Sequence, residues 1–338
     1  MAGRRYRGRM ASELPPLVKT LPDGVGRVSL PTPFRVGRVN CYVLPERPVT
    51  VIDPGTLQPG SLAKLRAFLK SDGLDFDDVE QIIVTHHHAD HCGAAAVLAA
   101  RSRASIVCGH PEVSRLLEPA DFQSRRALLL RLGVPGSTAS SLIETTDAAV
   151  ERVIRRPHPD MLTPMRDGDV VAAGGRRLEC IVTPGHAQGH LSLWDPDARV
   201  LFSGDHLLAR IIPVPSLEAD GDLRHRHSMI EYLGSLPRFV ALHPEVVLPG
   251  HGGAFTAVDV LAARLRSHAW QRAGEIETIL RAGPANPFEI SHSLQWQPDE
   301  ARLLFGLAHV QGHLDLLEDA GRVSAEQHAV VVAYRLPA

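Results

Sequence analysis

Four histidines and one aspartate lie within the six positions 86–91, directly after the short apolar run Gln81–Thr85. A short continuous apolar run predicts a strand buried on both faces, so the cluster is expected at a strand end. Partly protonated histidines packed this closely would repel one another, and a bound cation removes that objection. Imidazole and carboxylate are ligands that suit Zn²⁺ and its first-row neighbours. The cluster therefore predicts a metal site.

Three more ligand candidates follow later apolar runs, each beside a glycine: His186, Asp205 and His251. Glycine lets the backbone turn sharply, so these side chains are expected at the same sheet edge as the cluster. The sequence contains no G-x-S-x-G nucleophile motif, and Cys92 is interpreted as a small packed residue. The chemistry is therefore assigned to the metal site and not to a protein nucleophile.

The motif His86-x-His88-x-Asp90-His91, followed by His186, Asp205 and His251, resembles the metal signature of the metallo-β-lactamase superfamily of αββα hydrolases. The resemblance covers residues 27–256, with the motifs of the family present in order. It implies one metal held by His86, His88 and His186, a second held by Asp90, His91 and His251, and Asp205 as the bridge between them. It also implies that Asp53 orients ligands without binding metal.

A binuclear site of this kind predicts a hydrolase. Two divalent cations about 3.5–4 Å apart lower the pKa of a bridging water, so that hydroxide forms near neutral pH, while one cation polarises the scissile carbonyl or phosphoryl oxygen. Two Zn²⁺ ions per chain are expected, with Fe or Mn as alternatives. Asp90 and Asp205 are the candidate catalytic residues: Asp90 orients the hydroxide and moves its proton, and Asp205 bridges the pair.

The other nearby histidines are assigned different roles. In an extended segment the side chain of His87 points away from its neighbours, which favours structural packing. His190 and His206 are expected to support the ligands or pack. His225 and His227 lie in a polar loop and are weaker candidates for a general acid that protonates the leaving group.

The order of strands and helices predicts a layered α/β fold, and the resemblance makes it α/β (α+β), a four-layer αββα metallo-β-lactamase sandwich. The length of 338 residues suggests about two domains. We expect a flexible tail at 1–20, the sandwich at 21–282 with a helical insert at about 111–167, and a small winged-helix-like C-terminal region at 283–338.

The composition of the insert suggests which class of substrate the site takes. Its charges cancel, and it carries apolar residues such as Leu128–Leu130, Leu132, Val134, Met161, Leu162 and Met165. These residues either form the apolar underside of a lid or pack the core of the insert. As a lid they favour a carbonyl substrate with an apolar acyl portion, such as a thioester, ester or lactone. Four arginines could then meet an anionic group, or lie on solvated helix faces: Arg125, Arg126, Arg155 and Arg156.

Two alternatives remain on the same fold. The C-terminal region resembles the winged-helix extension of an endoribonuclease-like branch, although its six arginines and nine acids from Arg266 onward give a charge of −3, the wrong sign for binding nucleic acid. A mono-iron dioxygenase would need only His86, His88 and a third ligand like His186. A closed structural zinc site is disfavoured because the ligand set has no cysteine.

Partners and compartment follow from composition. The net charge of −2 gives no electrostatic reason to expect nucleic acid or an anionic membrane, so a small-molecule substrate is predicted. Four scattered cysteines and the absence of a long apolar run favour a soluble cytoplasmic protein. The Arg-rich start lacks the apolar core of a secretory signal, and a transit peptide and a homodimer both stay open.

Overall fold

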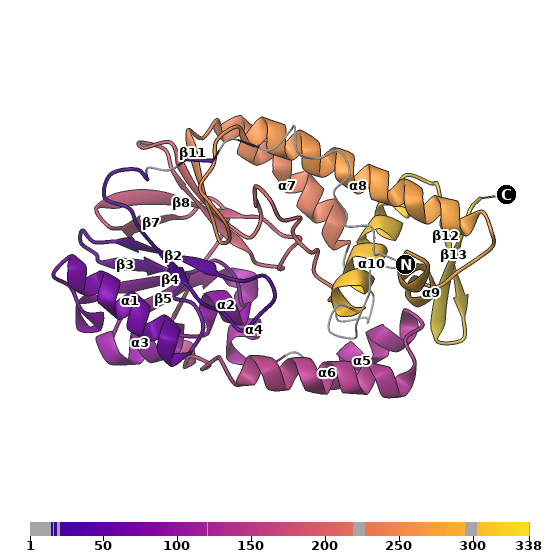
Figure 1. Cartoon of the computed structure of the whole chain (residues 1–338), viewed down its shortest axis with the longest axis horizontal. Coiled ribbons are helices and arrows are strands. Elements are labelled where there is room, and N and C mark those ends of the chain that lie inside the picture. Colours follow the sequence, from indigo (N-terminus) through magenta and orange to yellow (C-terminus); the bar gives the residue numbers. More distant parts are fainter. Residues whose placement is uncertain are drawn as a thin grey trace, which may run out of the picture.

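The computed structural model describes residues 15, 17–18, 21–119, 121–218, 227–294 and 303–337. Two sheets lie face to face (Figure 1). The first has the order β1-β2-β3-β4-β5-β6, with strands Gly26–Leu30, Val39–Leu44, Thr50–Ile52, Gln81–Val84, Ser105–Gly109 and Leu162–Met165. The second has the order β11-β10-β9-β8-β7, and β7 to β11 are Val170–Ala173, Arg176–Val182, Leu191–Asp195, Val200–Gly204 and Val246–Pro249.

Side-chain alternation along the strands builds four layers. In β2, Cys41 and Val43 share an apolar cluster with the helices α1 (Pro59–Ser71) and α3 (Ala95–Ser102), while Tyr42 and Leu44 pack between the two sheets. On the other side, α7 (Ser228–Leu242) and α8 (Val258–Leu280) share a cluster with the outer face of the second sheet. The expected αββα sandwich is therefore confirmed.

Parallel pairing brings the ends of several strands to one edge. Strands β3, β4, β5 and β6 are parallel neighbours, as are β10 and β11. Loops at the carboxyl ends of neighbouring parallel strands start from the same edge of a sheet, which is where α/β proteins place their sites. The polar residues after β3, β4, β5, β10 and β11 can therefore meet.

The insert is helical but shorter than expected. It contains α4 (Val113–Leu117), α5 (Phe122–Arg131) and α6 (Gly136–Glu151), and it is followed by the edge strand β6. Pro164 lies in β6, and proline is tolerated in an edge strand although it disfavours a strand prediction from sequence. Leu162 packs under the first sheet and Met165 between the sheets, so neither belongs to a lid.

The C-terminal region packs against the insert. It comprises α9 (Pro287–Ser293), α10 (Leu303–Asp319) and the hairpin β12–β13 (Ser324–His328, Val331–Arg335), and Ala285 bridges Tyr334. One apolar cluster joins Leu128, Leu129 and Leu132 of the insert to the C-terminal region. Figure 1 shows α5 and α6 below this region, and α8 running to it from the sandwich. The winged-helix character and the domain limits stay predictions.

Of the expected N-terminal tail, all but three residues lie outside the described part. Leu17 forms a bridge with Phe255, and the Val18 N–H donates to the Ala254 carbonyl at 2.8 Å. These contacts fasten residues 17–18 beside the second sheet. Among the described helices, none combines the length and apolar character needed to cross a bilayer.

Candidate metal centre

The structure brings all seven candidate ligands to one place at the strand ends. His86 and His88 follow β4, and Asp90 and His91 lie in the short helix α2 (Ala89–Cys92). His186 lies between β8 and β9, and Asp205 and His251 follow β10 and β11. Three groups each have ligand atoms within 4.8 Å of one another: His86, His88 and His186; His86, His91 and Asp205; and Asp90, His91 and His251.

The first group is formed by three imidazoles. The Nε2 atom of His86 lies 2.9 Å from Nδ1 of His88, and Nε2 of His186 lies 3.1 Å from the same Nδ1 atom. Tetrahedral Zn²⁺ bonds nitrogen at about 2.0–2.1 Å, which requires nitrogen atoms only slightly farther apart than these. The three nitrogens therefore match the first ligand set that the resemblance implies.

Asp205 contacts both the His86, His88 and His186 group and the Asp90, His91 and His251 group. Its Oδ2 atom lies 3.6 Å from Nε2 of His186 and 3.3 Å from Nε2 of His251, and its Oδ1 atom lies 3.5 Å from Nε2 of His91. The Oδ2 atom of Asp90 lies 3.3 Å from Nε2 of His251. Asp205 thus occupies the position that a bridging carboxylate needs.

Hydrogen bonds on the far side of the rings fix their tautomers. The Nδ1 atom of His186 bonds the Val214 carbonyl at 2.7 Å, and that of His251 bonds the Arg38 carbonyl at 2.8 Å. A carbonyl only accepts, so each Nδ1 carries a proton and each ring directs its Nε2 atom to the centre.

Asp53 holds the ring of His91 in the same way, by a contact with its Nδ1 atom. Its Oδ2 atom lies 2.8 Å from Nδ1 of His91 and accepts the Thr85 hydroxyl at 2.8 Å, while its Oδ1 atom accepts the Thr85 N–H at 2.8 Å. Asp53 has a φ of 52° and is buried. It contacts a candidate ligand from behind, in agreement with the orienting role that the resemblance implies.

The donor set of the centre fits a cation. Three of its atoms are buried without a hydrogen-bond partner among the described residues: Nε2 of His91, Oδ1 of Asp205 and Nε2 of His251. Buried polar atoms are rarely left unsatisfied in native proteins. Burial opposes a charge on His251, but Asp205 and Asp90 outweigh it and raise its pKa to about 10. The carboxylates that favour a proton here would also favour a metal cation.

Glycine is required where the loops meet. A Cβ atom on Gly250 would lie 2.3 Å from Oδ1 of Asp205 and 2.7 Å from Cε1 of His91. No side chain fits at these distances, so Gly250 lets the loop before His251 pass directly against Asp205. The glycines noted beside the ligand candidates thus include one that allows close approach.

The remaining histidines divide as follows. The ring of His87 bonds Glu112 and not the centre. His190 accepts the Asp205 N–H at 3.1 Å through Nε2, and His206 packs on Tyr232 and Phe239. His225 lies outside the described residues, His227 precedes α7, and their role as a general acid stays a prediction.

Cys92 has none of the properties of a nucleophile. It is buried, and its thiol donates to the His87 carbonyl at 3.1 Å. Burial, aided by the Asp90 charge, raises the pKa of this thiol far above the neutral range, so the reactive thiolate is not formed there. The interpretation of Cys92 as a packed residue agrees with this geometry.

Two residues that hold the centre were not singled out from the sequence. Asn40 donates from its amide to the Pro249 carbonyl at 2.8 Å and to the Gly252 carbonyl at 2.9 Å, which fixes the loop that carries His251. Glu112 bonds the loops on either side of the first group. The one signal available for Glu112 is its place after β5, at the same sheet edge as the ligands.

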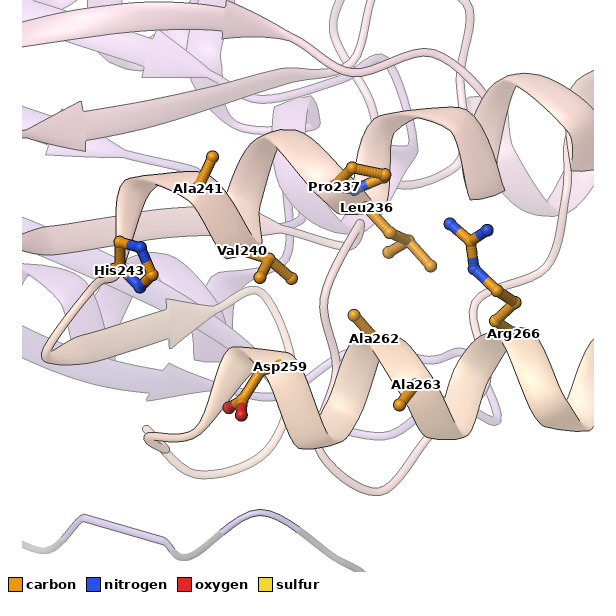
Figure 2. A pocket seen from close by; sticks show the side chains of 9 residues that line it. All are labelled: Leu236, Pro237, Val240, Ala241, His243, Asp259, Ala262, Ala263 and Arg266. Atoms are coloured by element: carbon orange, nitrogen blue, oxygen red, sulfur yellow. The ribbon is translucent and has the colours of Figure 1, made fainter.

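A hollow of about 400 Å³ lies between α7 and α8 on the outer layer, away from the candidate ligands (Figure 2). It is lined by Leu236, Pro237, Val240, Ala241, His243, Asp259, Ala262, Ala263 and Arg266. None of these residues is a candidate ligand or bonds one through the contacts described above. The chemistry is therefore placed at the strand ends and not in this hollow.

Comparisons with known proteins agree with this centre. The sequence matches the family described as "Metallo-beta-lactamase superfamily" over residues 34–251. The chain belongs to the metallo-beta-lactamase superfamily. It is 31% identical over 309 residues to "Probable metallo-hydrolase YqjP" of Bacillus subtilis, covering 88% of this chain and 92% of that one. Membership of this superfamily makes the chain a metallo-hydrolase by family.

Two further proteins are similar to this chain, one in structure and one in sequence. A metallo-beta-lactamase family protein of Thermus thermophilus, TTHA1429, superposes with a TM-score of 0.80 and 28% identity, covering 93% of this chain and 99% of that one. "Acyl-coenzyme A thioesterase MBLAC2" of Bos taurus is 29% identical over 244 residues, covering 66% of this chain and 75% of that one.

Proposed function

We propose that this superfamily member is a binuclear hydrolase of carbonyl substrates that carry an apolar acyl portion, with an acyl thioester as the first choice over an ester or lactone. The observation that carries the reaction class is the position of Asp205, which lies within 3.6 Å of His186 in one ligand group and 3.3 Å of His251 in the other. A mononuclear dioxygenase would not need the ligand group formed by Asp90, His91 and His251.

The proposed ligand roles follow the geometry. His86, His88 and His186 would hold the first cation, Asp90, His91 and His251 the second, and Asp205 both. Two bound divalent cations, with zinc as the first choice, would supply an activated water and a Lewis acid for the carbonyl oxygen. Asp90 is the proposed proton acceptor, because its side chain lies among the ligands yet retains 11% exposure, through which a proton can pass to solvent.

A small cavity lined mostly by leucines supports an apolar substrate portion. It has a volume of about 110 Å³ and is lined by Arg125, Leu128, Leu129, Leu217 and Leu304. Leu217 follows Ser216, whose N–H donates to the Gly185 carbonyl at 2.7 Å, one residue before His186. The segment 214–217 therefore contacts His186 through the Val214 carbonyl and lines this cavity with Leu217, and the cavity suits part of an acyl chain.

Relatives support the same substrate class. The bovine and human proteins named "Acyl-coenzyme A thioesterase MBLAC2" are each 29% identical to this chain over the matched residues. Thioester hydrolysis requires an activated water and a polarised carbonyl, which the proposed cations provide. The role of the insert as a lid stays a prediction, since Leu128 and Leu129 line the cavity and also pack in the core shared with the C-terminal region.

The reaction is tested with a substrate panel and metal analysis. Purified protein should contain about two transition metals per chain and hydrolyse acyl-coenzyme A thioesters, and Asp205→Asn should lose the bridged pair. Leu217→Trp should fill the cavity and lower kcat/KM for long acyl chains by about tenfold or more, while acetyl substrates serve as the internal control.

Other outcomes point elsewhere. Cleavage of a short RNA with no turnover of carbonyl substrates, abolished by His88→Ala, would replace this proposal with the endoribonuclease-like alternative. One tightly held iron and no zinc would favour the dioxygenase. An equal loss for all acyl lengths in Leu217→Trp would leave the reaction class standing and remove the cavity from it.

A further inference from the structure

Glu112 is a buried carboxylate whose partners lie in two separate loops of the candidate metal centre. It ends the short 3-10 turn His110–Glu112 after β5, and its side chain is 0% exposed. Its Oε1 atom accepts the Gly189 N–H at 2.7 Å. Its Oε2 atom accepts the His87 N–H at 2.8 Å and bonds the ring Nδ1 atom of His87 at 2.6 Å.

The first of these loops carries His86 and His88. The peptide groups around His87 are held on both sides, by Glu112 at the N–H and by the Cys92 thiol at the carbonyl. His87 lies between the candidate ligands His86 and His88, so holding its N–H, carbonyl and ring fixes the peptide groups from which the two flanking imidazoles project.

The second loop carries His186. Gly189 lies three residues after His186, and the chain after β5 runs directly against it. A Cβ atom on Gly109 would lie 2.0 Å from the Gly189 carbonyl oxygen, and one on Gly189 would lie 2.7 Å from the Glu112 nitrogen. Glycine at both positions lets the backbones approach closely enough for the Glu112 carboxylate to reach the Gly189 N–H.

We infer that Glu112 is a positioning residue that joins the loop of His86 and His88 to the loop of His186, and so sets the spacing of these three imidazoles before a metal binds. Burying a carboxylate is costly unless charged and hydrogen-bonded groups compensate it. Here the compensating groups are contributed by the two loops, so the carboxylate links them. The inference rests on the proposed metal centre.

The variant Glu112→Gln isolates this link. A glutamine amide has nearly the shape of a carboxylate, but one of its two terminal atoms is a donor. Whichever way the amide is turned, its NH₂ group faces a backbone N–H, of either Gly189 or His87. The variant therefore releases one loop while retaining the size of the side chain.

Metal affinity gives the first readout. The first site is the one formed by His86, His88 and His186. Competition with a chromophoric chelator should show that this site binds zinc roughly 10- to 100-fold more weakly in Glu112→Gln than in the wild type, which is the range for residues that orient ligands. The second site should change less. Equal affinity of wild type and variant for both ions would overturn the inference, whereas a wild type that binds no metal would overturn the proposed function instead.

Asp195→Asn is the matched control. Asp195 is also a buried carboxylate, bonded to Arg176 at 2.6 Å and to the N–H groups of Asp197 and Ala198. It ends β9 at the opposite end from the ligands. Its substitution should lower Tm and leave both zinc affinities unchanged. If it weakens zinc binding as much as Glu112→Gln does, Glu112 acts only through general stability.

Amide hydrogen exchange tests the same link without metal and without a variant. In full-length, metal-stripped wild-type protein, the amides of His87 and Gly189 should exchange at least tenfold more slowly than unprotected loop amides, because both are bonded to Glu112. Exchange of both at unprotected rates would overturn the inference, even where Glu112→Gln fails to fold. Slow exchange of both supports it, independently of which substrate the enzyme hydrolyses.

Discussion

Single residues behind the candidate ligands set the chemistry of the centre. Asp53, the Val214 carbonyl and the Arg38 carbonyl each bond Nδ1 of a different imidazole, at 2.7–2.8 Å. Since these contacts occupy Nδ1, each ring directs Nε2 to the centre, where a cation would displace any proton that Nε2 carries. The rings are therefore already oriented as ligands before a metal binds.

Asp53→Asn tests this at one position. Asparagine tolerates the positive φ of residue 53, so the fold should persist, but its amide cannot accept all the bonds that Asp53 accepts from Thr85 and His91. Zinc affinity should fall roughly 10- to 100-fold, measured by chelator competition, with an unchanged circular dichroism spectrum. Unaltered affinity would show that His91 does not depend on Asp53.

The limits of prediction from sequence are clear at this scale. His86, Asp205 and His251 could be found because each follows an apolar run, and the residue type itself suggests coordination. Glu112 and Asn40 could not be assigned in this way, because a carboxylate or amide that bonds backbone N–H or carbonyl groups leaves no mark on spacing. Their role depends on which distant loop lies opposite, which only the folded chain defines.

At the scale of elements, strands β6 and β4 differ in how well the sequence predicted them. The four residues of β6 include a proline and follow a helical insert, so pattern alone favoured the insert. Strand β4, which is apolar throughout its buried part, was predicted correctly. Strand β4 was found because its buried run is apolar, whereas β6 was missed because it contains a proline and lacks such a run.

Helix α8 offers a stability test. A Cβ atom added at Gly274, inside this helix, meets no atom within 4 Å. Glycine is unfavourable in a helix interior by roughly 0.5–1 kcal/mol relative to alanine. Gly274→Ala should therefore raise the free energy of unfolding in urea by about that amount.

The same substitution in α10 is the control. A Cβ atom at Gly312 would lie 2.9 Å from Cβ of Met229 in α7. Overpacking of this kind costs about 1–3 kcal/mol, so Gly312→Ala should lower the free energy of unfolding. If both variants shift it in the same direction, the contacts of α10 with α7 do not limit the space at Gly312.

At the scale of the whole molecule, the insert and the C-terminal region are joined by one core. Leu132 and Ile143 of the insert and Leu307, Leu314 and Tyr334 of the C-terminal region are buried in the same cluster. The sequence showed apolar residues at helical spacing in both segments, but periodicity does not reveal which face packs on which. Their association could therefore not be predicted.

A buried histidine in α10 predicts how stability depends on pH. Burial lowers the pKa of His313 to about 4, with His268 and Arg272 adding to the effect. The unfolded chain then binds this proton more readily than the folded one. The contribution of the neutral ring is complete above about pH 6.5 and is lost as the pH falls toward 4, by about 3 kcal/mol in total.

Comparison with His313→Gln isolates this contribution. Urea unfolding of the metal-stripped proteins between pH 7.5 and 4 should show a steeper loss of free energy in the wild type, because the variant has no proton to bind at this position. Parallel curves for the two proteins would mean that His313 titrates alike in the folded and unfolded states.

The core that joins the insert to the C-terminal region also constrains how such a chain can change over time. Neither segment can be shortened alone without exposing leucines of the other to water, at about 25 cal/mol for each Å² uncovered. Among homologues, the two segments should therefore be gained, trimmed or lost as a pair. This should hold although, among the described residues between Ile143 and Ala273, Leu217 alone packs against the cluster.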